Sequence, residues 1–144
     1  MNNNVRSIDI RKLFILPAVN VIIALAIILS NKLIYGNSST IANYMAITFL
    51  FADILMLVIY LNARKKNNYS LYAGVSGKED KSILERNFYE STINSSLASM
   101  LTLISTFVLL MKGSKEGFYI FIILLYIVVI AYGSIKISQK YKTK

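Results

Sequence analysis

Four long apolar runs separated by short polar segments are the dominant pattern along this chain. The runs occupy residues 13–30, 41–61, 93–111 and 117–135. A helix of about 20 residues crosses the roughly 30 Å of a bilayer's hydrocarbon core, and each run is close to that length. Apolar residues lie on nearly all sides of each predicted helix, unlike the one-sided helices of a soluble bundle. The pattern predicts an all-α integral membrane protein, an antiparallel bundle of four transmembrane helices in a single domain comprising residues 1–144.

The lengths of the polar segments predict how these spans connect. The short segments 31–40 and 112–116 make antiparallel hairpins of spans one and two and of spans three and four. Only the connection 62–92 is long. In it, Ser76 and Glu79 have capping-box spacing, and apolar residues recur downstream at helical spacing. We therefore expect a short helix starting near Gly77, which either lies on the membrane or runs straight into span three.

The basic residues are distributed unevenly between the two ends of the predicted spans. If both termini lie on one side, that side holds 13 of the 16 Lys and Arg residues, and the other holds Lys32, Lys112 and Lys115. Because Lys and Arg concentrate in cytoplasmic segments, we expect both termini and the connection 62–92 in the cytoplasm. The net charge of +9 then reflects membrane topology, and no nucleic-acid partner is expected.

The composition narrows the chemistry open to this chain. It contains no Cys and no His, and so lacks disulfides, a catalytic thiolate and the commonest general base and metal ligand. Phosphate-binding, dinucleotide-binding, metalloprotease and serine-hydrolase motifs are also missing. We expect no enzyme activity, no cofactor and no metal site. The bias toward Ile, Lys, Asn and Tyr is typical of AT-rich bacterial genomes, which favours a bacterial plasma membrane as the location.

Asp53 is the only charged residue inside a predicted span. A carboxylate near the centre of a membrane helix costs about 2.5–3.5 kcal/mol on insertion scales, so such a residue is a candidate functional site. With cytoplasmic boundaries at residues 12, 62, 92 and 136, each span offers a polar side chain at a similar depth, roughly 10–15 Å from the boundary at 1.5 Å per residue. We predict one polar layer in the bundle interior, formed by Asn20, Asp53, Ser99, Thr102 and Tyr126.

Two interpretations of this layer stay open. In the structural one, Asp53 accepts hydrogen bonds from its neighbours and fixes the register of the helices. In the functional one, Asp53 binds a proton or a cation, or lines a polar cavity. Span three also carries a stripe of small hydroxyl residues, which favours close helix packing over an ion path: Thr92, Ser95, Ser99, Thr102 and Thr106.

The three consecutive basic residues Arg64, Lys65 and Lys66 follow span two directly. Basic residues at this position attract anionic lipid headgroups, at about 1 kcal/mol per residue. We expect these side chains to contact the lipid bilayer at its cytoplasmic surface.

The leading functional hypothesis is a non-catalytic protein that acts by contact with another membrane component. An immunity or resistance factor against a membrane-active peptide fits, as does an accessory subunit of a transporter or secretion complex. The alternative is a small transporter or channel coupled to protons or cations through Asp53, with a homodimer as the expected assembly. A third possibility is a holin-like pore protein.

Overall fold

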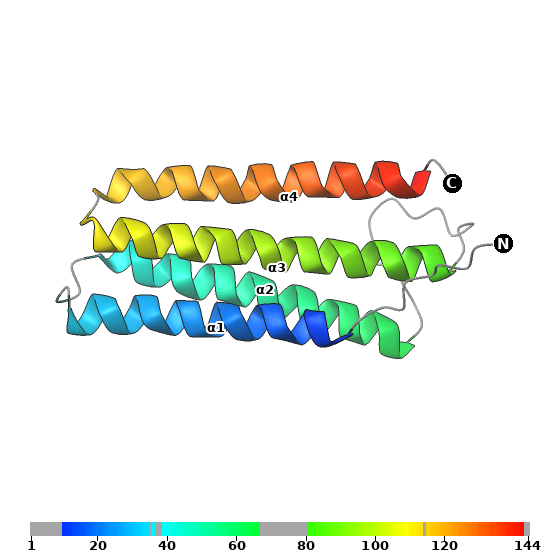
Figure 1. The fold of residues 1–144 in the computed structure, drawn as a ribbon, viewed down its shortest axis with the longest axis horizontal. Coiled ribbons are helices and arrows are strands. Elements are labelled where there is room, and N and C mark those ends of the chain that lie inside the picture. Colours follow the sequence, from blue (N-terminus) through cyan, green and yellow to red (C-terminus); the bar gives the residue numbers. More distant parts are fainter. Residues whose placement is uncertain (1–9, 35, 37–38, 67–80, 114, 143–144) are drawn as a thin grey trace.

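Every secondary-structure element of the described residues is helical in the computed structural model, which describes residues 10–34, 36, 39–66, 81–113 and 115–142 (Figure 1). The elements are α1 (Ile10–Leu33), α2 (Thr40–Lys66), α3 (Lys81–Met111), the short 3-10 helix η1 (Glu116–Phe118) and α4 (Tyr119–Lys142). Each of the four α-helices is long and apolar enough to cross a membrane. The prediction of four apolar helices is confirmed for this part of the chain.

Helix α3 is longer than the apolar run that predicts it. It continues without a break from Lys81 to Met111, although the apolar run begins only at residue 93. Of the two arrangements expected for the connection, this is a helix that runs straight into span three. The predicted helix start near Gly77 and the capping pair Ser76 and Glu79 lie outside the described residues.

Helices α1, α2 and α3 pack against one another, whereas α4 packs chiefly on α3 (Figure 1). In the most apolar stretch of α4, 11% of residues are buried, compared with 44% in α3. Within the expected four-helix arrangement, three helices therefore form a close-packed group and the fourth lies along one side of it. Small residues on α3, among them Ser95, Ala98 and Ser99, are buried and allow its backbone to approach its neighbours closely.

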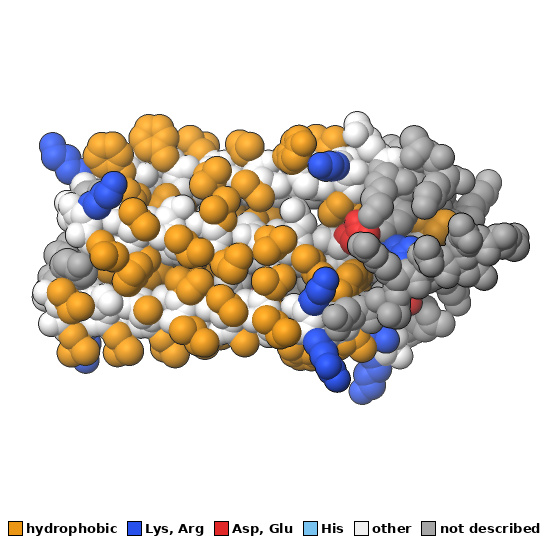
Figure 2. Space-filling model, viewed as in Figure 1, with side chains coloured by type: hydrophobic (Ala, Val, Ile, Leu, Met, Phe, Trp, Pro, Cys, Tyr) orange, Lys and Arg blue, Asp and Glu red, His pale blue; other side chains and the backbone are white. Residues whose placement is uncertain are grey.

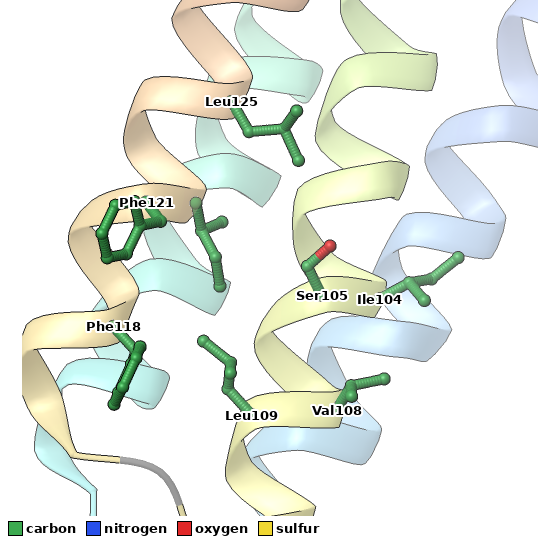
Figure 3. Close-up of a pocket in the computed structure, with 8 residues that line it drawn as sticks. Ile104, Ser105, Val108, Leu109, Phe118, Phe121 and Leu125 are labelled. Carbon is green, nitrogen blue, oxygen red and sulfur yellow. The ribbon is translucent and has the colours of Figure 1, made fainter.

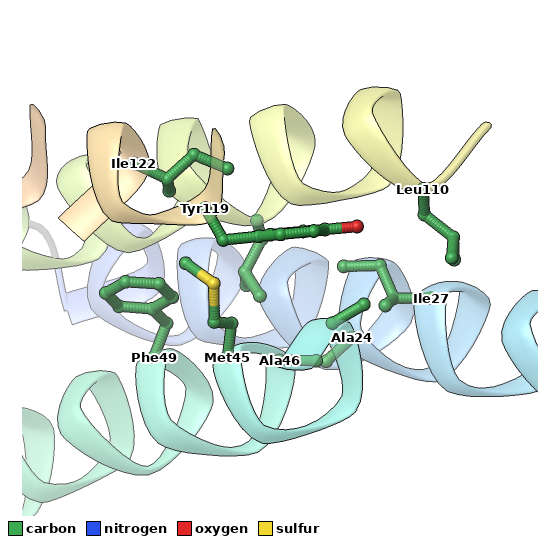
Figure 4. Packing of buried hydrophobic residues seen from close by; sticks show 10 residues of the cluster. Ala24, Ile27, Met45, Ala46, Phe49, Leu110, Tyr119 and Ile122 are labelled. Atoms are coloured by element: carbon green, nitrogen blue, oxygen red, sulfur yellow. The ribbon is translucent and has the colours of Figure 1, made fainter. Parts of the chain in front are cut away.

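The buried face of α1 follows a strict alternation of four-residue and three-residue steps. Its members are Leu13, Pro17, Asn20, Ala24, Ile27 and Asn31. This heptad-like spacing keeps one seam of a helix facing its neighbours in left-handed packing. Two apolar clusters lie along the bundle on either side of Asn20. The first includes Ala24, Ile27, Met45, Phe49 and Tyr119 (Figure 4), and the second includes Leu13, Leu57, Tyr60 and Phe88.

The surface divides into an apolar belt and charged ends. Figure 2 shows apolar side chains across the middle of the visible face, with Lys and Arg side chains only toward its two ends. The start of α1 and the end of α4 lie at the same end of the molecule (Figure 1). Exposed apolar residues along the belt include Ile22, Phe51, Phe121 and Val128. An apolar belt between charged ends is the surface expected of a protein surrounded by lipid, and it indicates a multi-pass membrane protein.

Candidate functional site: a polar layer in the three-helix core

The carboxylate of Asp53 lies in the centre of the three-helix core, with no exposed surface. The side-chain amide of Asn20 in α1 donates a hydrogen bond to Asp53 Oδ2 at 2.6 Å. The hydroxyl of Ser96 in α3 donates a short hydrogen bond to Asp53 Oδ1. The same Asn20 amide also donates to the backbone carbonyl of Ser96 at 3.1 Å. These bonds join α1, α2 and α3 at one level.

Apolar side chains close this layer on both sides along the bundle axis. Phe49 in α2 lies one turn from Asp53 on one side, and Leu57 lies one turn away on the other. Each belongs to a different apolar cluster. A hydrogen bond in such surroundings gains electrostatic strength, and an unpaired polar group there becomes costly. The polar contacts of Asp53 are therefore expected to hold the three helices in one register.

Of the predicted layer, Asn20 is the residue whose hydrogen bond to Asp53 is observed. Thr102 is fully buried, and its hydroxyl donates within α3 to the carbonyls of Ala98 and Ser99. Tyr126 is half-buried in α4 and packs its ring on Phe49, with ring centroids 4.9 Å apart. These contacts of Thr102 and Tyr126 are with α3 and with Phe49, and they do not include the carboxylate of Asp53.

The stripe of hydroxyl residues on α3 is buried along its whole length. Thr92, Thr102 and Thr106 each donate to a carbonyl of the preceding turn of the same helix. Hydroxyls satisfied in this way leave a compact, weakly polar surface that lets neighbouring backbones approach. The contacts match the expectation that the stripe serves helix packing.

Ser96 is the residue of the site that the sequence did not single out. The predicted depths take Thr92 as the boundary of span three, directly after the charged segment that ends at Glu90. Helix α3 is continuous from Lys81, so its charged first turns and its apolar part form one helix. The α3 residue at the depth of Asp53 is therefore about one turn closer to the start of α3 than predicted. A boundary near Phe88 would have placed Ser96 at the depth of Asp53.

Two oxygen atoms within one turn of this level are buried without a hydrogen-bond partner. One is Oδ1 of Asn20, on the same amide group that donates to Asp53, and the other is the hydroxyl of Ser99. Both residues have no exposed surface. Buried polar atoms are nearly always satisfied in native structures, so each unsatisfied one calls for a physical explanation.

A second polar network lies at the end of the bundle where α1 turns into α2. The side-chain amide of Asn31 in α1 donates to the carbonyl of Ser39 at 2.7 Å and to Oδ1 of Asn43 at 3.0 Å. The hydroxyl of Ser39 accepts from the backbone N–H of Ala42 at 3.2 Å, the geometry of a helix N-cap for α2. Its own contact with the hydroxyl of Tyr119, at 3.5 Å, reaches the start of α4. This network ties the turn between α1 and α2 to α4.

The three basic residues at the end of α2 differ in their surroundings. Arg64 is half-buried, and its Nε lies 3.6 Å from Oε1 of Glu85 in α3. Lys65 and Lys66 are exposed. Arg64 thus pairs with the first turns of α3, and the side chains of the two lysines are exposed to the surroundings. Their role toward lipid headgroups remains a prediction.

An apolar groove lies between α3 and α4 near the end formed by their connection (Figure 3). It has a volume of about 360 Å³, and Phe118 of η1 with Phe121 and Leu125 of α4 face Ser105 and Leu109 of α3 across it. The hydroxyl of Ser105 donates to the carbonyl of Leu101, so the lining offers hardly any free polarity. A groove with such an apolar lining favours hydrocarbon groups, such as lipid acyl chains, over polar ligands.

Among the described residues, no group of three or more Asp, Glu, His or Cys side chains is placed to bind a metal ion. Comparison of the chain with protein families, with curated proteins and with solved structures finds no match. The fold and the site together indicate a class, a multi-pass helical membrane protein with a buried polar layer. Its function has to be inferred from its own contacts.

Proposed function

We propose that this chain is a non-catalytic protein of a bacterial plasma membrane that acts by contact with another membrane component. The observation that supports this most is the packing of α4, which is covered along one side by α3 and leaves most of its apolar residues exposed. The polar groups of α1, α2 and α3, in contrast, bond to one another. The face of α4 is the part of the molecule best suited to meet a partner within the bilayer.

Two kinds of partner fit this proposal. A membrane-active peptide could be intercepted by the apolar face of α4, which would make the chain an immunity or resistance factor. A larger membrane protein could receive the same face, which would make the chain an accessory subunit of a transporter or secretion complex. We propose an orientation with both termini in the cytoplasm, supported by the concentration of basic residues at that end of the chain.

The test is photo-crosslinking in the native membrane with a matched pair of positions. Phe121 on α4 and Ile22 on α1 are both 67% exposed and both lie in the apolar belt. A photoreactive amino acid at position 121 should give a discrete protein or peptide adduct, whereas the same group at position 22 should give lipid adducts only. Lipid adducts alone at both positions would contradict the proposal.

A small transporter or channel coupled to protons or cations through Asp53 is the second candidate. The unsatisfied oxygens of Asn20 and Ser99 favour it, because they leave binding capacity in and next to the polar layer. Purified protein in vesicles should then show flux driven by a pH or cation gradient. Asp53→Asn should abolish that flux while the protein still folds. A partner-binding protein should show no such flux and should keep its crosslinks in the variant.

A further inference from the structure

The charge of Asp53 has no ionic partner among the described residues. Its hydrogen-bond donors are the neutral amide of Asn20 and the neutral hydroxyl of Ser96. Arg64, which lies on the same helix, pairs with Glu85 instead. A fully buried carboxylate surrounded by apolar clusters needs a compensating positive charge, because neutral donors lower its cost without cancelling its charge.

One unsatisfied oxygen is on the amide that donates to this carboxylate, and the other is on Ser99, one turn along α3 from the donor Ser96. Oδ1 of Asn20 is two covalent bonds from the nitrogen that donates to Asp53, so it lies within about 5 Å of Asp53 Oδ2. Ser99 follows Ser96 by three residues on α3, and side chains at that spacing have Cβ atoms about 5–6 Å apart. Both carboxylate oxygens of Asp53 have lone pairs left after accepting one bond each. The layer therefore gathers oxygen acceptors from three helices.

We propose that this layer binds one monovalent cation of the sodium class, through oxygens of Asp53, Asn20 and Ser99. A bound cation supplies the missing charge and satisfies both lone oxygens at once. A water molecule would satisfy them without supplying charge. A proton on Asp53 would supply the charge but could reach only one of the two oxygens.

The proposed ligands determine which kind of cation the layer prefers, both in its charge and in its preference for oxygen ligands. Carboxylate, amide carbonyl and hydroxyl oxygens are ligands of hard cations. Calcium takes six to eight oxygens, and magnesium keeps several waters in its shell. A buried site with a single carboxylate matches one positive charge in a partly dehydrated state. The ion joins α1, α2 and α3, so the site stabilises the fold whichever partner or transport role the chain has.

The direct test is the thermal unfolding of the full chain in detergent micelles, in sodium chloride and in choline chloride at equal ionic strength. A ligand that binds only the folded state raises the melting temperature as its concentration rises. We expect a rise of several degrees in sodium chloride that follows a saturable binding curve. Binding of radioactive sodium to the wild-type protein should approach one ion per chain.

Three variants separate the site from the rest of the core. Asp53→Asn should abolish the sodium-dependent rise, and Ser99→Ala should shift the curve to higher sodium concentrations. Thr106→Ala removes another fully buried hydroxyl of α3, one that bonds to its own helix, and should leave the sodium dependence unchanged. If Asp53→Asn fails to fold, the comparison of Ser99→Ala with Thr106→Ala and the wild-type binding measurement still decide.

Three results would overturn the proposal. Equal melting temperatures in sodium and choline chloride would leave water as the occupant. Stability that depends on pH but not on sodium would assign the compensating charge to a proton. A sodium effect that survives in both Asp53→Asn and Ser99→Ala would place the ion elsewhere. Each result is independent of whether the α4 face has a partner.

Discussion

At the residue scale, the main energetic cost in the core is the burial of the Asp53 carboxylate. Placing its carboxylate near the centre of a membrane helix costs about 2.5–3.5 kcal/mol. Hydrogen bonds between membrane helices contribute on average about 0.6 kcal/mol each, and bonds to charged groups contribute more, about 1.5–3 kcal/mol. The two bonds from Asn20 and Ser96 are comparable in size to this insertion cost, but both donors are neutral and leave the negative charge of Asp53 in the core. Removing one donor should leave the carboxylate undercompensated.

Asn20→Ala tests this account of the polar layer. The variant removes the amide that donates to both Asp53 and the carbonyl of Ser96. We expect the free energy of unfolding in micelles to fall by about 1–3 kcal/mol. Asn62→Ala, at an exposed position near the end of α2, is the matched control and should change stability little. Equal stability of both variants would show that the amide of Asn20 contributes nothing to the core.

At the element scale, the sequence predicts the existence of the helices better than their arrangement. Hydropathy finds all four because length and apolarity are the conditions for crossing lipid. Depth counting brings Asn20 to Asp53, because both lie a similar number of residues from the same end of the bundle. It misses Ser96 because the charged first turns of α3 obscure where that helix begins. The lateral place of α4 is not encoded in hydropathy, since lipid and protein are equally apolar neighbours for its side chains.

The contact between α3 and α4 depends on a glycine. A Cβ atom added to Gly133 would lie 2.2 Å from Nδ2 of Asn94, so the Asn94 side chain rests on the backbone of α4. Gly133→Ala should displace the Asn94 side chain from this contact and destabilise the protein by about 1 kcal/mol, the low end of the cost of overpacking. Adding Asn94→Ala should restore most of the loss, and equilibrium unfolding of the two single variants and the double variant measures the coupling.

Gly117 supplies the control for this cycle. A Cβ atom at Gly117 meets nothing within 4 Å, so Gly117→Ala should leave the packing of α4 undisturbed. A similar loss in Gly117→Ala and Gly133→Ala would mean that backbone freedom, and not the contact with Asn94, decides the effect. No rescue by Asn94→Ala would lead to the same conclusion.

At the scale of the whole molecule, polarity is sorted from the inside outward. The polar side chains at the centre bond to one another, the surface of the middle region is apolar, and the charges lie at the ends (Figure 2). This order is the reverse of a soluble protein and is the order that a bilayer stabilises. The basic residues Lys32, Lys112 and Lys115 mark one end, and Arg11, Lys65 and Lys66 mark the other.

Site-directed cysteine labelling tests the four-span arrangement most directly, because the natural chain contains no Cys to interfere. Lys115→Cys should react with an impermeant maleimide in intact cells. Lys65→Cys should react only after the membrane is permeabilised, and Asp53→Cys should stay unreactive in both conditions. Reaction of positions 115 and 65 from the same side, or ready reaction of position 53 with the aqueous reagent, would contradict four membrane crossings around a buried polar layer.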